Sequence, residues 1–345
     1  MKALWKVLLL AGYGAVEAAT PLPHLHASTE WLTTSGISSG AYMAVQFQVA
    51  HSALVRGAGV VAGGPFACAQ GQVKRALADC MAPTAETPPP DVKTQQQAIN
   101  TLARNGKIDN PDHLRAHRVW MFSGGSDKTV QRPVMDALAS FYQSVLPESA
   151  IRYVKYAEAG HAMPSVDANN ANACASSEPP FINRCQQLDA AGDMLRHLLG
   201  PLNGKGVRAE GRMLSFDQRP FVRGTPQDAS LDDDGYVYIP KSCDSGGCRI
   251  HVVFHGCLQN ADAVGTRFVE GAGYNRWADT NRLLIIYPQT RSRHGLAAGS
   301  WKFIMNPKGC WDWWGYTGEG YHTREGMQIR AVKAMIDHLV QPETR

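Results

Sequence analysis

Two serines lie between glycines in the run Gly36-Ile37-Ser38-Ser39-Gly40, which fits the pattern G-x-S-x-G with Ser38 at its centre. In a nucleophile elbow of this kind, the serine occupies a strained turn between a strand and a helix, and the glycines keep side chains away from the crowded backbone. The short motif also arises by chance in Gly/Ser loops. A short strand candidate at 31–34 and an apolar helical stretch after the run favour the elbow, so Ser38 is the predicted nucleophile.

A serine hydroxyl needs a general base, and that base needs a carboxylate to orient it. In α/β hydrolases the three residues follow the chain order Ser, Asp, His on loops after successive strands. Asp127 follows the apolar strand "RVWMF", and His161 follows the strand "IRYVKYA". A loop aspartate is often only a turn residue, and twelve histidines make chance placement easy. Order, strand ends and neighbouring glycines together favour Asp127 and His161 over Asp109, Asp112 and His117, which precede the strand.

Acyl transfer also needs N–H donors for the oxyanion, one from the residue after the nucleophile and one from a His-Gly loop after another strand. The first donor is the backbone N–H of Ser39. A His-Gly pair is missing upstream of Ser38 and stands far downstream, in His255-Gly256-Cys257 at the end of the strand "HVVF". A circular permutation explains this order, because chain ends that lie close together tolerate such rearrangement. The sequence therefore predicts that the loop His255-Gly256-Cys257 supplies the second donor.

Strands alternate with helices along the chain, which predicts a mostly parallel central sheet with helices on both faces. We expect one catalytic domain over residues 19–345, with the proline-rich stretch 86–91 as a surface loop and 201–227 as a long connection. The expected strands lie in 57–65, 117–127, 151–161, 235–240, 249–257 and 282–290, and the expected helices in 132–146, 186–200 and 324–340.

The N-terminus has the features of a secretory signal peptide: a basic start, the short apolar core "VLLLAGYGAV" and a small-residue exit. We expect cleavage after Ala18 and export to the periplasm or the medium. The apolar core is too short for a membrane helix. The chain has a formal net charge of +4 with its basic residues scattered, which argues against a nucleic-acid partner.

The eight cysteines agree with export, because an oxidising compartment favours disulfides. Eight cysteines allow 105 connectivities, and pairing between neighbours along the chain is the simplest of them. None of the cysteines has the spacing of a zinc site with histidine partners. The expected pairs are Cys68–Cys80, Cys174–Cys185, Cys243–Cys248 and Cys257–Cys310.

Six motifs in this order, "SGISSGAYMA", "GGSDKTV", "AGHAMPS", "FHGCLQ", "YPQT" and "GCWDWWGY", resemble those of secreted single-domain poly(3-hydroxybutyrate) depolymerases. The resemblance implies a circularly permuted α/β-hydrolase that needs no cofactor or metal. It also implies that Ser38 is the nucleophile, His161 the base and Asp127 its orienter, with the N–H groups of Ser39 and Cys257 as the oxyanion hole. No separate polymer-binding domain is recognisable in the sequence.

An aliphatic polyester suits a shallow apolar cleft, and one loop concentrates the aromatic residues that could line it. If this loop is extended, Trp311 and Trp313 face one side and Trp314 the other, although each tryptophan could equally belong to the core. The partner is then a polyester or its oligomers, and we expect a monomer. A feruloyl or acetyl esterase on plant polysaccharide, a soluble-oligomer esterase or a non-catalytic binding protein remain alternatives, because fold does not determine substrate. The predicted cleft residues are Trp311, Trp313, Trp314 and Tyr316.

Overall fold

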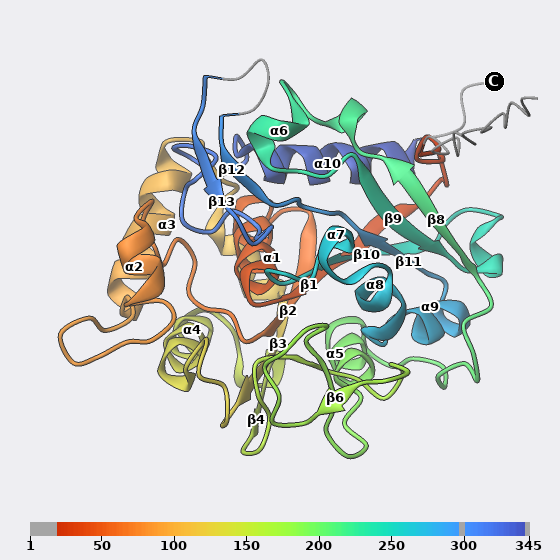
Figure 1. Ribbon diagram of the computed structural model, residues 1–345, viewed down its shortest axis with the longest axis horizontal. Helices are drawn as coiled ribbons and strands as arrows, with labels where there is room; N and C mark the ends of the chain where they lie inside the picture. Colours follow the sequence, from red (N-terminus) through yellow and green to blue (C-terminus); the bar gives the residue numbers. More distant parts are fainter. Residues whose placement is uncertain (1–18, 297–300, 342–345) are drawn as a thin grey trace, which may run out of the picture.

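The computed structural model describes residues 19–296 and 301–341, so the predicted signal peptide at 1–18 lies outside the described residues. An eight-stranded sheet crosses the molecule in the order β4-β3-β2-β1-β10-β11-β9-β8 (Figure 1). The first six strands of this order pair in parallel, and β9 pairs antiparallel with both neighbours. The strands are β1 (Ser28–Ile37), β2 (Val55–Val61), β3 (Arg118–Gly124), β4 (Ile151–Tyr156), β8 (Arg212–Asp217), β9 (Asp234–Ile239), β10 (Arg249–Phe254) and β11 (Leu283–Tyr287).

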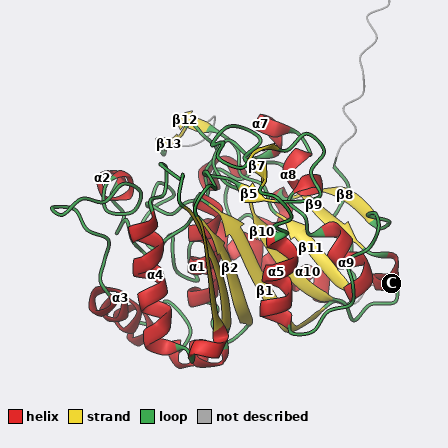
Figure 2. Cartoon of the chain, turned by 90° about the horizontal axis from the view of Figure 1, so that it is seen from below, coloured by secondary structure: helices red, strands yellow, loops and turns green. Residues whose placement is uncertain are grey.

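Helices cover both faces of the sheet, as predicted (Figure 2). Strand residues alternate between two hydrophobic clusters, since Ile250 and Val252 of β10 face one cluster and Val253 the other. The first cluster includes residues of α1 (Ser39–Ala50), α3 (Val92–Arg104), α4 (Arg132–Val145) and α10 (Met327–Val340). The second includes residues of α5 (Ala190–Leu199), α7 (Ala261–Val264), α8 (Arg267–Gly271) and α9 (Asn275–Asn281).

The sheet order confirms the permuted architecture. β1 comes first in the chain, and β10, which leads into the His-Gly loop, comes late, yet the two are parallel neighbours with Gly36 opposite Phe254. The His251 ring strengthens this pairing from inside the core, because Thr33 and Ser35 of β1 hydrogen-bond its two nitrogens at 2.7 and 2.8 Å. The elbow and the His-Gly loop therefore emerge at the same edge of the sheet.

The segment 201–227, predicted as a connection, contains an edge strand, so that prediction was wrong. β8 pairs along its whole length with β9, but only Phe216 of its six residues is buried. An edge strand of this kind lacks the apolar run that marks the central strands. The remaining short elements are α2 (Val73–Leu77), α6 (Pro226–Ala229), a small sheet of β5 (Met163–Pro164), β6 (Asn172–Ala173) and β7 (Ile182–Arg184), and a hairpin of β12 (Arg293–Gly295) and β13 (Ile304–Asn306).

All four predicted disulfides are present: Cys68–Cys80, Cys174–Cys185, Cys243–Cys248 and Cys257–Cys310. Three of these disulfides join cysteines that are five to twelve residues apart in the sequence, whereas Cys257 and Cys310 are 53 residues apart. Within the described ranges, no helix is long and apolar enough to cross a membrane.

Four buried histidines make stability depend on pH. Burial lowers the pKa of His251 to about 3 and the pKa of His51, His117 and His255 to about 4, from 6.5. Between these values and pH 6.5 the unfolded chain binds protons that the folded chain does not, so stability falls as pH falls through this window. We expect each histidine to cost roughly 1.4 kcal/mol per pH unit there. Denaturant titrations at pH 7, 5.5 and 4.5 measure the effect, and an unfolding free energy that stays constant would contradict it.

Candidate active site

Ser38 occupies the turn between β1 and α1 with a positive φ of 56°. This positive-φ conformation, with ψ at −124°, is strained for a residue other than glycine. Any side chain at Gly36 would collide with the carbonyl of Gly40, and one at Gly40 would collide with the carbonyl of His255. The N–H of Ser38 donates to the carbonyl of Val61 at 3.0 Å, which fixes the turn against β2. The predicted elbow is therefore present, and it requires both flanking glycines.

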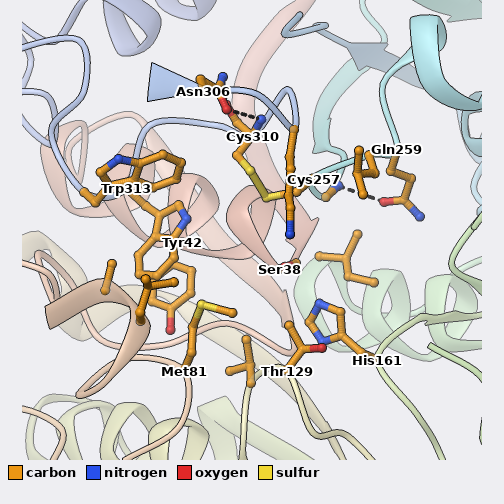
Figure 3. A pocket seen from close by; sticks show the side chains of 18 of the residues that line it. Ser38, Tyr42, Met81, Thr129, His161, Cys257, Gln259, Asn306, Cys310 and Trp313 are labelled. Atoms are coloured by element: carbon orange, nitrogen blue, oxygen red, sulfur yellow. Dashed lines mark hydrogen bonds between the residues drawn. A yellow bond between two sulfur atoms is a disulfide. The ribbon is translucent and has the colours of Figure 1, made fainter. Parts of the chain in front are cut away.

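Asp127 and His161 form a buried pair at the ends of β3 and β4. The Nδ1 atom of His161 lies 2.8 Å from Oδ2 of Asp127, and the side chains are 7% and 1% exposed. The other carboxylate oxygen accepts the N–H groups of Thr129 and Val130 at 2.8 and 2.9 Å. Since a carboxylate only accepts, Nδ1 carries the proton of the ring and Nε2 is left as the basic atom. His161 and Ser38 line the same pocket (Figure 3).

Two backbone N–H groups adjoin Ser38. Ser39 is the first residue of α1, and the N–H groups of the first helical turn have no acceptor within the helix. The hydroxyl of Ser39 is used elsewhere, because it accepts the N–H of Trp311 at 3.3 Å. Cys257 follows Gly256, whose Cα approaches Ser38 so closely that an added Cβ would lie 3.4 Å from the serine Cβ. These positions suit an oxyanion hole.

The His255 side chain orients the peptide bond between Gly256 and Cys257. Its Nε2 atom accepts the backbone N–H of Thr290 at 3.2 Å, so the ring proton lies on Nδ1. Nδ1 donates this proton to the carbonyl of Gly256 at 2.7 Å. In a trans peptide the N–H points opposite to the carbonyl, so the N–H of Cys257 points away from the buried histidine. It is thus free to face the pocket that Cys257 lines together with Ser38.

The same loop is held by two further connections. The Gln259 side chain accepts the N–H of Gly256 at 2.7 Å and donates to the carbonyl of Pro180 at 2.9 Å, so it joins the loop to the segment after His161. The Cys257–Cys310 disulfide joins it to the tryptophan loop (Figure 3). Sequence reasoning missed Gln259, although its place three residues after Gly256 is visible in "FHGCLQ".

The pocket above Ser38 has a volume of about 420 Å³, and most of its lining is apolar. Trp313 and Trp314 form part of its wall, and Trp313 stacks on Tyr42 with ring centroids 4.2 Å apart. Four further apolar lining residues come from α2, the His-Gly loop and β13, and the sequence did not indicate these side chains: Val73, Leu77, Leu258 and Met305.

Trp311 and Tyr316 do not line this pocket, so their prediction as cleft residues was wrong. Trp311 is fully buried and packs edge-on against Phe254. The Tyr316 hydroxyl donates to the carbonyl of Cys310 at 2.7 Å in the interior. The expected alternation fails because the loop is not extended: it folds around the buried carboxylate of Asp312, which accepts the N–H groups of residues 314–317.

Comparison with known proteins finds two curated relatives. The chain is 41% identical over 338 residues to a poly(3-hydroxybutyrate) depolymerase of Delftia acidovorans, covering 96% of this chain and 64% of that protein. It therefore spans less than two thirds of the length of this relative. It is 35% identical over 344 residues to a polyhydroxybutyrate depolymerase of Talaromyces funiculosus, covering 97% of both chains. No family model matches.

Solved structures agree with these relatives. The crystal structure of a PHB depolymerase from Penicillium funiculosum superposes with a TM-score of 0.82 at 32% identity, covering 93% of this chain and 99% of that one. A PHB depolymerase carrying a serine-to-alanine substitution, in complex with an R3HB trimer, matches with the same score and coverage.

Proposed function

The chain belongs to the family of poly(3-hydroxybutyrate) depolymerases, and we propose that it hydrolyses the ester bonds of poly(3-hydroxybutyrate) or a similar short-chain polyhydroxyalkanoate with Ser38 as nucleophile. The observation that carries the proposal is the meeting of the elbow, the Asp127–His161 pair and the His-Gly loop at one apolar pocket. The reaction needs no cofactor.

The geometry supports a two-step acyl transfer. Nε2 of His161 takes the Ser38 proton as Oγ attacks the ester carbonyl carbon. The oxyanion binds to the N–H groups of Ser39 and Cys257, and His161 then protonates the departing alcohol. Water, activated by the same nitrogen, attacks the acyl-enzyme and releases the acid. Asp127 holds the ring and stabilises its protonated form throughout.

The pocket wall supports an aliphatic polyester as substrate. Repeating methyl groups and neutral esters match a lining of aliphatic and aromatic side chains, of which Trp313 and Trp314 are the largest. The feruloyl and acetyl esterase alternatives use the same chemistry and differ in the preferred acyl group. We further propose that the enzyme is secreted and acts as a monomer. The predicted signal peptide and the four disulfides support secretion.

The test compares release of 3-hydroxybutyrate units from polymer films with hydrolysis of feruloyl esters and acetylated sugars by the same preparation. We expect the enzyme to release soluble 3-hydroxybutyrate units from the film and to hydrolyse feruloyl esters and acetylated sugars poorly. Fast turnover of feruloyl esters without film degradation would instead support the plant-polysaccharide alternative.

An exposed apolar edge beside the pocket fits a solid substrate. Along the segment that ends in β13, Trp301, Phe303 and Met305 point outward with 97%, 57% and 51% exposure, while Ile304 and Asn306 are buried. Met305 also lines the pocket, so the exposed edge continues into the site. Exposed apolar side chains gathered in this way mark interaction surfaces.

We expect Trp301→Ser to reduce film degradation about fivefold or more, because adsorption loses a large apolar contact. Hydrolysis of a soluble butyrate ester should stay within twofold, since Trp301 does not line the pocket. Trp31→Ser is the matched control. Trp31 is also exposed, but it lies at the start of β1, six residues before the strand reaches the elbow. Equal losses in the two variants, or on both substrates, would contradict a role in adsorption.

A further inference from the structure

Lys308 is the one lysine, arginine, aspartate or glutamate that lines the pocket in the described part of the chain. Its side chain is exposed. Among the described residues, no carboxylate forms an ion pair with it, so its ammonium group is available to a ligand. It is thus the one such charged side chain at an otherwise apolar cleft, placed where it can pair with a negatively charged group of a substrate or product.

The backbone of Lys308 is fixed beside the proposed oxyanion hole. Its carbonyl accepts the N–H of Leu258 at 2.7 Å, directly after Cys257. Two residues further on, Cys310 is bonded to Cys257, and its N–H donates to the Asn306 side chain at 2.8 Å. The lysine therefore starts from a rigid position on the His-Gly side of the pocket, and its flexible stem can swing the ammonium along the cleft.

The chemistry of a 3-hydroxybutyrate oligomer supplies the negative charge. Each oligomer has one hydroxyl end and one carboxylate end. When Ser38 attacks an internal ester, the acyl carbon bonds to Oγ, and the C–O bond to the alcohol breaks. The departing alcohol fragment takes the proton from His161 and keeps the original carboxylate end. When the departing fragment is short, its carboxylate stays close to the apolar pocket, where an unpaired charge is costly.

We propose that Lys308 binds the terminal carboxylate of soluble 3-hydroxybutyrate oligomers on the leaving-group side of the pocket. The inference rests on the proposed function and adds a subsite to it. Lys308 then favours cleavage next to the carboxyl end of short oligomers, while internal bonds of a long polymer chain do not use it. The lysine is a specificity determinant for oligomers and not part of the acyl-transfer machinery.

The experiment uses two substrates that differ only in the charge of one end: the 3-hydroxybutyrate trimer and its terminal carboxamide. The expected result is that Lys308→Met lowers the ratio of kcat/KM for the acid to that for the amide two- to fivefold, the range of an exposed ion pair. Added salt should also lower this acid-to-amide ratio of kcat/KM for the unmodified enzyme, because salt screens the ion pair. Lys93→Met is the matched control for net charge, because Lys93 is exposed on α3, which contributes no residue to the pocket.

An unchanged ratio in Lys308→Met would overturn the inference. Equal losses on acid and amide would overturn it too, since Lys308 would then act on the reacting ester or on the loop. Failure of the unmodified enzyme to hydrolyse either trimer would be a different result, which counts against the proposed function itself.

Discussion

Ser38→Ala is expected to lower kcat for a soluble butyrate ester by roughly 10⁴-fold or more, the loss seen when a serine hydrolase loses its nucleophile. The substitution removes only the hydroxyl oxygen and leaves the elbow backbone in place, since the hydrogen bond from the Ser38 N–H to Val61 does not involve the side chain. The folded protein should therefore keep its circular dichroism spectrum and melting temperature. Initial rates on the purified variant measure the effect.

Ser39→Ala is the matched control, because it removes a neighbouring hydroxyl and keeps the backbone N–H that the oxyanion needs. The Ser39 hydroxyl accepts only the N–H of Trp311 in the described structure, so we expect kcat to fall by about tenfold or less. If Ser38→Ala retained substantial turnover while Ser39→Ala lost it, the assignment of the nucleophile would be wrong.

Asp127→Asn is expected to lower kcat by about 10⁴-fold with little change in KM. Both carboxylate oxygens are occupied, one by Nδ1 of His161 and the other by the N–H groups of Thr129 and Val130. In the variant, the N–H groups of Thr129 and Val130 still require an oxygen acceptor. The asparagine amide therefore places its oxygen toward these two groups and its NH₂ group toward His161. The ring must then carry its proton on Nε2, where it can no longer accept the proton of Ser38.

Asp112→Asn serves as the comparison for this variant. Asp112 precedes β3, forms an exposed pair with Arg115 and does not line the pocket. The Asp112→Asn substitution should change the rate of hydrolysis of soluble esters less than twofold. A similar loss in both variants, or a rate for Asp127→Asn within tenfold of the unmodified enzyme, would remove Asp127 from the proposed triad.

The sequence predicted those parts of the site that depend on local chemistry. The elbow could be predicted because its strained turn admits only glycine at positions 36 and 40. Asp127 and His161 could be predicted because the carboxyl ends of parallel strands lie at the same edge of the sheet. The displaced His-Gly pair indicated the permutation, and β1 beside β10 confirms it. Neighbour pairing of cysteines succeeded because three of the four loops are short.

The pocket wall could not be predicted in the same way, because it depends on which side chains tertiary packing leaves exposed. The sequence "GCWDWW" suggests that its three tryptophans lie together at the cleft. In the structure, backbone N–H groups bind the buried Asp312 carboxylate, so the loop folds back on itself and Trp311 packs in the core. The hairpin that carries Met305 and the helix that carries Val73 approach the site from distant parts of the chain. The edge strand β8 was missed because only one of its six residues is buried.

Trapping of the covalent intermediate tests the central claim, that Ser38 carries the acyl group of a 3-hydroxybutyrate ester. The enzyme is mixed with 3-hydroxybutyrate trimer, quenched with acid during turnover, digested and mapped by mass spectrometry. We expect a mass increase of one or more 3-hydroxybutyryl units on the peptide that contains Ser38, and no such adduct in Ser38→Ala. An adduct on another residue, or turnover of the trimer by the Ser38→Ala variant, would contradict it.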